Sequence, residues 1–401
     1  MFDATFPACF WEGFLPLSSQ PLGNEGLLIT LRADPSRLAR CSRCHHPCRR
    51  VHDTHLRRVR DANLFEYRVW LDVPVRRVLC RHCGVSREHL PWLPSHARLT
   101  TRMQQYAEQL LRLLPIKHVA QLTGLHWHTL KGIDKARLTR DLPAPDLRRV
   151  RYLLMDEFAL HKGHRYATVV MDAERRSVLW VGTGRSRESV RPFFLWLGEH
   201  CQHIEAVAMD QNTAMDLEVR AHCPNARVVY DLFHVVAKYG REVIDRVRVD
   251  QANQLRHDKP ARRLVKQSRW LLLRNPENLD QRQAASLDEL LAVNQPLMLA
   301  YLMKSQLKGL WYARTERAAR WRLTHWLNQA LSSGVASLER FARNLRPYAE
   351  GIIASASYPL STSVLEGVNN RIKVIKRMAY GYRDVDYFFL KIKAAFPGNA
   401  R

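Results

Sequence analysis

Carboxylates that follow two apolar segments are the first residues here whose type and placement suggest chemistry. Asp156 ends the run RYLLM and Asp210 ends IEAVAM, and both runs are typical of buried strands. In an open α/β sheet, sites form at the carboxyl ends of neighbouring strands. Two such carboxylates, with a third from a facing helix, predict an oxygen-ligand site for Mg²⁺ or Mn²⁺.

The segment LSTSVLEGVNNRIKVIKRMAYGYRD, residues 360–384, predicts a helix with two different faces. Spacings of three and four residues place an acid, an amide and two cations on one face, namely Glu366, Asn370, Lys373 and Arg377. The opposite face is apolar and consists of Leu365, Val368, Ile372, Ile375 and Ala379. We expect Glu366 to be the third metal ligand and the other three side chains to contact DNA phosphates. The alternative is an ordinary solvated amphipathic helix.

Other acids compete for these roles. Asp231 ends the strand-like run ARVVY and is followed by His234, and spacing alone does not separate it from Asp210. Glu157 and Asp216 are further competitors. A single Asp after a strand is more often a turn residue or a helix cap than a ligand.

Two Cys-x-x-Cys pairs flank a segment with strand alternation, which predicts a zinc ribbon. The expected Zn²⁺ ligands are Cys41, Cys44, Cys80 and Cys83. Four nearby side chains could replace one of them, namely Cys48, His45, His46 and His82.

The segment LPIKHVAQLTGLHWHTLKGID predicts two helices joined by a short turn at Thr123 and Gly124. This is the outline of a helix-turn-helix. Base edges are contacted by the N-terminal part of the second helix, which here holds His126, Trp127, His128, Thr129 and Lys131. The alternative is a plain helical hairpin in a linker domain.

Charge indicates the class of partner. The 401 residues include 63 Lys and Arg against 38 Asp and Glu, a formal charge of +25. Such an excess favours a polyanion, most simply double-stranded DNA. No apolar run reaches the ~20 residues that span a bilayer, and the N-terminus lacks the basic start of a signal peptide. We therefore expect a cytoplasmic protein without a membrane partner, whose cysteines bind metal or stay free thiols.

The order of elements predicts a multidomain chain. After residue 150, three strands and then helix, strand, helix and strand follow one another, the order of an RNase H-like α/β domain. The predicted parts are an N-terminal extension at 1–40, a β zinc ribbon at 41–95, an α helix-turn-helix domain at 96–145, the first part of the RNase H-like domain at 150–239, an all-α insertion at 240–350, and the final helix and tail at 351–401.

These parts, with the blocks MDEF, AMDQNTAM, PNARVVYDLFHVV and EGVNNRIKVIKRMAYGYRD in this order, resemble the ISL-three family of bacterial insertion-sequence transposases. The resemblance implies a DDE transposase whose RNase H-like domain cleaves and joins DNA with Mg²⁺. It places the catalytic triad on Asp156, Asp210 and Glu366. It also implies that Asp231 and His234 lie near the site, in a role it does not define.

The resulting hypothesis is a transposase that binds the terminal inverted repeats of its element through the ribbon and the helix-turn-helix. Chemistry at both ends implies at least a dimer on DNA, associated with the bacterial nucleoid. The first alternative is an inactivated or domesticated relative that acts as a repressor or architectural protein. A structure-selective nuclease or resolvase is the second, and a zinc-ribbon transcription factor is a weaker third.

Overall fold

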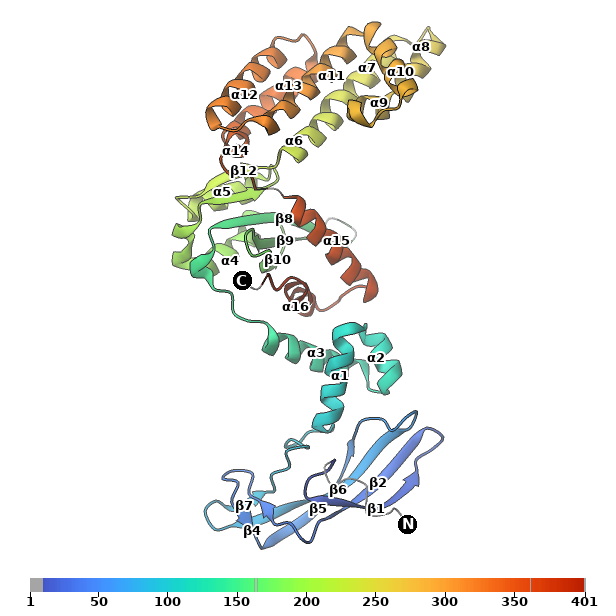
Figure 1. Cartoon of the computed structure of the whole chain (residues 1–401), viewed down its shortest axis with the longest axis vertical. Coiled ribbons are helices and arrows are strands. Elements are labelled where there is room, and N and C mark those ends of the chain that lie inside the picture. Colours follow the sequence, from blue (N-terminus) through green and yellow to red (C-terminus); the bar gives the residue numbers. More distant parts are fainter. Residues whose placement is uncertain (1–9, 162, 164, 361, 400–401) are drawn as a thin grey trace. The chain divides into compact units, whose positions relative to one another are not determined.

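The computed structural model describes residues 10–399 except 162, 164 and 361, so residues 1–9 of the expected N-terminal extension lie outside it. The chain forms two compact units (Figure 1), one within residues 1–142 and 376–390 and one within 143–375 and 391–401. Among the described residues, every helix is too short or too polar to cross a bilayer.

The first unit begins with a five-stranded sheet. Four of its strands follow the order β1-β2-β6-β5, and the fifth, β7, also pairs with β6 but lies outside this order. Its strands are β1 (Phe14–Pro21), β2 (Gly26–Ala33), β5 (Val51–Arg60), β6 (Arg68–Cys80) and β7 (Gly84–Arg87). Alternate side chains of β6 form its core, namely Val69, Leu71, Val73 and Val75. Because β2 pairs in parallel with β6, residues 14–33 belong to this sheet instead of standing apart from it. Strand periodicity could not show that pairing, which joins segments about 40 residues apart in the chain.

A short hairpin of β3 (Ala39–Arg40) and β4 (Pro47–Cys48) lies beside the first cysteine pair. Three helices follow, α1 (Thr101–Leu113), α2 (Ile116–Thr123) and α3 (Trp127–Asp141). Gly124 ends α2 in the left-handed conformation at φ 69°, and the His126 side chain caps α3. The helices therefore show the expected helix-turn-helix outline.

The second unit contains a sheet in the order β10-β9-β8-β11-β12. Its strands are β8 (Tyr152–His161), β9 (Arg165–Asp172), β10 (Ser177–Thr183), β11 (Ala206–Met209) and β12 (Arg227–Tyr230). Strands β8, β9 and β10 are antiparallel, whereas β11 pairs in parallel with both β8 and β12. Its connecting helices are α4 (Arg187–Leu197), α5 (Thr213–His222) and α6 (Leu232–Tyr239). This sheet has the expected RNase H-like arrangement.

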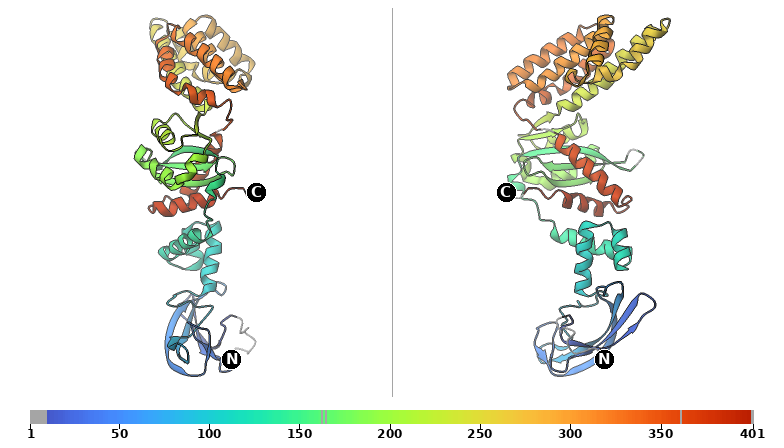
Figure 2. Two further views of the ribbon diagram at one scale, coloured as in Figure 1. Left: turned by 90° about the vertical axis from the view of Figure 1, so that its left-hand side faces the viewer. Right: turned by 45° about the vertical axis from the view of Figure 1, so that its right-hand side comes forward.

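The chain between α6 and the last two helices is helical and packs as a bundle (Figure 2). Its helices are α7 (Asp245–Gln254), α8 (Lys259–Gln267), α9 (Arg269–Leu273), α10 (Gln281–Ala292), α11 (Gln295–Lys308), α12 (Glu316–Leu331), α13 (Ala336–Leu345) and α14 (Ala349–Ala354). A continuous apolar core runs from the sheet into this bundle. The chain then continues into α15 (Ser363–Met378) and α16 (Val385–Ala395).

Short helical turns complete the connections. The 3₁₀ turns are Leu147–Arg149, Gly198–His203, Pro276–Asn278, Gly309–Tyr312 and Arg346–Tyr348. A π-helical turn, Gly240–Ile244, joins α6 to α7.

Candidate active site and metal-binding sites

Three acids stand at the same level of three neighbouring strands. Met209 of β11 is in register with Met155 of β8 and with Tyr230 of β12. The next residue along each strand is an aspartate, namely Asp210, Asp156 and Asp231. Parallel pairing thus brings Asp156 and Asp210, which lie more than 50 residues apart in the chain, to the same level of the sheet. The expectation that Asp156 ends its strand is wrong, because β8 continues to His161 through its antiparallel pairing with β9.

Asp156 is held by hydrogen bonds to both carboxylate oxygens. The Glu157 N–H donates to Oδ1 at 2.7 Å, and Asn369 Nδ2, from α15, donates to Oδ2 at 2.6 Å. Burial raises the pKa of Asp156 to about 6, and the negative charge of Asp210 acts in the same direction. The other oxygen of this amide, Asn369 Oδ1, is buried and accepts no hydrogen bond from the residues that the structure describes.

Asp210 is more accessible, with 40% of its side chain exposed. His234 Nδ1, from α6, lies 3.2 Å from its Oδ2. Burial raises the pKa of Asp210, and the charges of Asp231 and Glu157 add to this, while His234 opposes it. Two neighbouring acids with raised pKa values are typical of a site that binds a cation or a proton.

Asp231 is engaged differently. Its Oδ1 accepts the Phe233 N–H at 2.7 Å, which caps α6. Its Oδ2 accepts two hydrogen bonds from Thr362, from the N–H at 3.1 Å and from the hydroxyl at 2.5 Å. Both carboxylate oxygens are thus used by the protein, whereas Asp210 contacts His234 through Oδ2 and lines a pocket.

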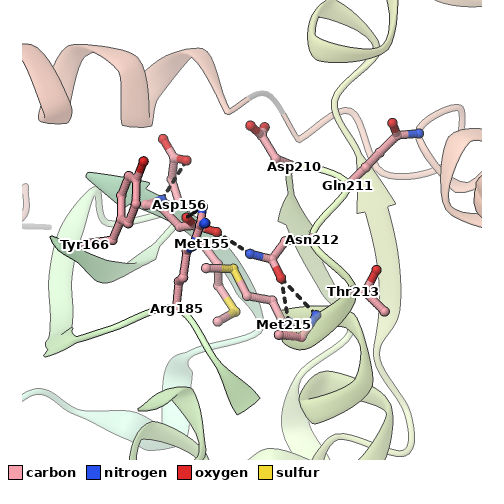
Figure 3. Close-up of a pocket in the computed structure, with 11 residues that line it drawn as sticks. Met155, Asp156, Tyr166, Arg185, Asp210, Gln211, Asn212, Thr213 and Met215 are labelled. Atoms are coloured by element: carbon pink, nitrogen blue, oxygen red, sulfur yellow. Dashed lines mark hydrogen bonds and ion pairs between the residues drawn. The ribbon is translucent and has the colours of Figure 1, made fainter. Parts of the chain in front are cut away.

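That pocket has a volume of about 590 Å³. Asp156 and Asp210 line it (Figure 3), together with Met155, Glu157, Tyr166, Arg185, Gln211, Asn212, Thr213, Ala214 and Met215. Both carboxylates point toward the ribbon of α15 in this view. The site therefore combines two acids with open space large enough for an extended ligand.

Arg185, Tyr166 and Asn212 are pocket residues that sequence reasoning missed. The Arg185 guanidinium lies 4.3 Å from the centre of the Tyr166 ring and 3.4 Å from Glu157 Oε2. Asn212 caps α5 through Oδ1 and donates to Glu157 through Nδ2. Tyr166 and Arg185 lie outside the motifs quoted above, and Asn212 lies in the block AMDQNTAM, where the sequence gave it no role. The three residues reach the pocket from different elements, so no local pattern connects them.

Glu366 is exposed on the first turn of α15, one helical turn before Asn369. The buried side of this helix is formed by Leu365, Val368 and Ile372, as the apolar stripe predicts. Among the described residues, groups of three or more potential ligands within 4.8 Å of one another are confined to four cysteines. The structure thus places Glu366 on the helix that contacts Asp156, but not at common ligand distance from both aspartates.

Three family models match the chain in order. A zinc-finger model of the transposases IS204, IS1001, IS1096 and IS1165 matches residues 37–83, and a helix-turn-helix model of transposase family ISL3 matches residues 88–138. A transposase model of the same family matches residues 153–392, more than half of the chain. The chain belongs to the ISL3 family of transposases.

Related proteins agree with this family. The ISL3-family chain is 54% identical, over 98% of its length and 97% of the relative's, to the transposase for insertion sequence element IS1001 of Bordetella parapertussis. It is 27% identical, over 90% of its length and 86% of the relative's, to the transposase for insertion sequence element IS1557 of Mycobacterium tuberculosis.

The chain is also similar to a solved structure, the Drosophila P element transposase strand transfer complex. The match covers 75% of this chain and 92% of the chain in that structure. Its TM-score is 0.39 at 10% identity. The family and the relatives confirm the sequence prediction of an insertion-sequence DDE transposase.

The zinc-ribbon part of this ISL3-family transposase brings four thiols together. Cys41, Cys44, Cys80 and Cys83 lie with their sulfurs within 4.8 Å of one another. The Arg43 N–H points at Cys41 Sγ at 3.4 Å, as in a Cys-x-x-Cys knuckle around a metal. The four neighbours that could have replaced a ligand, Cys48, His45, His46 and His82, do not belong to this group. Four clustered thiols suit tetrahedral Zn²⁺.

The helix-turn-helix of this transposase exposes most of its predicted DNA-binding residues. His126, Trp127, His128 and Thr129 are exposed at the start of α3. Lys131 is different, because its Nζ lies 2.8 Å from Asp384 Oδ2, a partner that the sequence did not indicate. On α15, the side chains of Asn370, Lys373 and Arg377 are exposed, and Lys373 Nζ lies 3.3 Å from Asn370 Oδ1.

Proposed function

We propose that this transposase cleaves the ends of its insertion sequence and joins them to target DNA, using Asp156, Asp210 and Glu366 to bind Mg²⁺ or Mn²⁺. The observation that supports this most is the in-register placement of Asp156 and Asp210 beside an open pocket. Glu366 joins them in the proposal because its helix contacts Asp156 through Asn369.

The residues present fit a divalent metal ion. The pKa values of both aspartates are raised by burial, and a bound cation would offset that cost. The unpartnered Asn369 Oδ1 beside Asp156 is a further oxygen of the kind that hard cations prefer. When bound, Mg²⁺ would activate the attacking hydroxyl and stabilise charge on the phosphate oxygens.

The chain's own residues bind and orient the DNA around this centre. Asn369 fixes the orientation of the Asp156 carboxylate, and His234 does the same for Asp210. The amide and cations Asn370, Lys373 and Arg377 are placed to contact phosphates along the exposed face of α15. These contacts hold the strand and carry no sequence information.

Recognition of the element's ends is assigned to the first unit. We propose that Cys41, Cys44, Cys80 and Cys83 hold a structural Zn²⁺ that stabilises the ribbon. The residues proposed to read the terminal inverted repeats in the major groove are His126, Trp127, His128, Thr129 and Lys131. An element has two ends, so the active complex is proposed to be at least a dimer. Its proposed location is the bacterial nucleoid, in the cytoplasm.

Excision in cells tests the catalytic assignment. A selectable marker flanked by the DNA from either side of this gene is supplied with wild-type protein, Glu366→Gln or Asp216→Asn. Asp216 is a matched control, because it is an acid on α5 that pairs with Arg220 and does not line the pocket. We expect excision by the wild type and Asp216→Asn but not by Glu366→Gln. Equal excision by all three would refute the role of Glu366.

A binding measurement on the same proteins separates catalysis from DNA contact. Glu366→Gln removes a proposed metal ligand and no proposed phosphate contact, so binding to the ends should stay within a few-fold of the wild type. A comparable loss of binding and excision would show that Glu366 serves DNA binding.

A further inference from the structure

Helix α15 is attached to the sheet at two points. Thr362, just before the helix, donates two hydrogen bonds to Asp231 at the end of β12. Asn369, on the second turn, donates to Asp156 on β8. Glu366 lies between the two attachments in the sequence, four residues after the first and three before the second.

The spacing of these attachments matches the spacing of the strands. β11 lies between β8 and β12, so the outer two are separated by two strand spacings, roughly 10 Å. The seven residues from Thr362 to Asn369 rise roughly 10 Å along a helix. A helix fixed at both points therefore spans β12, β11 and β8. Glu366, in the middle of this segment, falls at the level of β11, the strand that Asp210 follows.

The first attachment also closes the helical insertion. The chain leaves the sheet at Asp231, where α6 begins, and returns at Thr362, 131 residues later. Thr362 is only 4% exposed, so its hydroxyl and N–H depend on Asp231 for partners. One carboxylate thus caps the first helix after the sheet and holds the start of the helix that brings the chain back.

We propose that Asp231 is a positioning residue that sets the place of Glu366 through Thr362. The inference rests on the proposed role of Glu366 as a metal ligand. It explains why an acid at the same strand level as Asp156 and Asp210 does not face the pocket: both its oxygens are used to hold α6 and α15. It also gives Asp231 a role that sequence reasoning left open.

Two substitutions break this contact in different ways. Asp231→Asn keeps an oxygen for the Phe233 N–H but offers Thr362 an NH₂ group in place of an acceptor. Thr362→Val removes the hydroxyl donor from the other side, and Thr362→Ser retains it as the matched control. Outer-shell partners of metal ligands typically contribute ~10- to 100-fold to metal affinity, and the lower end applies to a residue that acts through Thr362.

The measurement is Mn²⁺ binding to the full-length, zinc-loaded protein by electron paramagnetic resonance, with end binding as a check on folding. We expect Asp231→Asn and Thr362→Val to weaken Mn²⁺ binding ~10-fold and Thr362→Ser to stay within about twofold. In a Glu366→Gln background the same substitutions should have no further effect, because the ligand they position is absent.

The outcomes separate the inference from the function on which it rests. If Glu366→Gln weakens Mn²⁺ binding but Asp231→Asn and Thr362→Val do not, the positioning role is wrong and the catalytic assignment stands. Weakening by equal factors with and without Glu366 would show a general structural effect and overturn the inference. If Glu366→Gln leaves Mn²⁺ binding and excision unchanged, the proposed catalytic role fails and the inference fails with it.

Discussion

Metal binding at the acidic site should depend on pH in a range where ordinary aspartates do not titrate. A divalent ion requires ionised carboxylates, and burial raises the pKa of Asp156 to about 6. The affinity for the divalent ion should therefore be highest well above pH 6 and should fall as the pH drops through 6. With a pKa of about 6, Asp156 is ionised in roughly one molecule in eleven at pH 5 and in nearly all molecules at pH 8. Because only the ionised form binds the metal, affinity should be ~11-fold lower at pH 5 than at pH 8.

An aspartate at its ordinary pKa would behave differently. It would be roughly 94% ionised at pH 5, so affinity would change by less than ~10% over the same range. The raised pKa of Asp210 acts in the same direction and makes ~11-fold a lower limit.

The assay is Mn²⁺ binding by electron paramagnetic resonance at pH 5, 6, 7 and 8, with the zinc site filled beforehand. Asp156→Asn serves as the control, since it removes the titrating group and should flatten this part of the pH dependence. A change of less than twofold between pH 5 and 8 in the wild type would show that Asp156 does not titrate near pH 6 or does not bind the metal. So would an equally steep profile in Asp156→Asn.

Three other predictions address separate parts of the chain. Cys80→Ser should lose zinc and bind the element's ends more weakly, because the zinc cluster stabilises the ribbon. Metal analysis should show that the control, Cys48→Ser, retains its zinc. Unchanged zinc in Cys80→Ser would contradict the ligand set. Lys373→Ala should weaken binding to all DNA sequences and reduce the slope of log affinity against log salt by ~0.9, and a changed sequence preference would count against a phosphate contact. Gly351→Ala should destabilise the fold by ~1–3 kcal/mol, since the added carbon would lie 2.5 Å from a buried tyrosine ring, while Gly309→Ala meets nothing within 4 Å. Equal thermal midpoints for these two variants would contradict the packing argument.

Local patterns in the sequence were enough to indicate the parts of the molecule. Strand alternation, helical spacing and the two Cys-x-x-Cys pairs depend on neighbouring residues, and the structure contains the ribbon sheet, the helix-turn-helix and the RNase H-like sheet in the expected order. The exposed and buried faces of α15 also agree with its sequence pattern, because helical periodicity acts within one segment. The family followed from motifs of the same local kind.

Local sequence patterns do not indicate which distant segments pair with one another. The sequence did not show that β1 and β2 join the ribbon sheet, or that Lys131 would pair with Asp384, 253 residues away. Nor could it show the contacts of Arg185 with Tyr166 and Glu157 in the pocket. Each depends on how elements pack, which the spacing of residues along the chain does not record.

The choice between Asp210 and Asp231 shows the difference between local sequence signals and contacts that depend on packing. From the sequence alone it followed that an acid comes directly after each of the apolar runs now seen in β8, β11 and β12, because an apolar run followed by a polar residue is a local signal. Which of these acids line the pocket, Asp156 and Asp210 but not Asp231, became visible only in the folded chain. The Asp231 carboxylate accepts a hydrogen bond from Thr362, which lies 131 residues later in the chain. Asp210 instead contacts His234 and lines the pocket. The physical reason is that the partners of a carboxylate are set by strand register and by the return of the chain after the insertion.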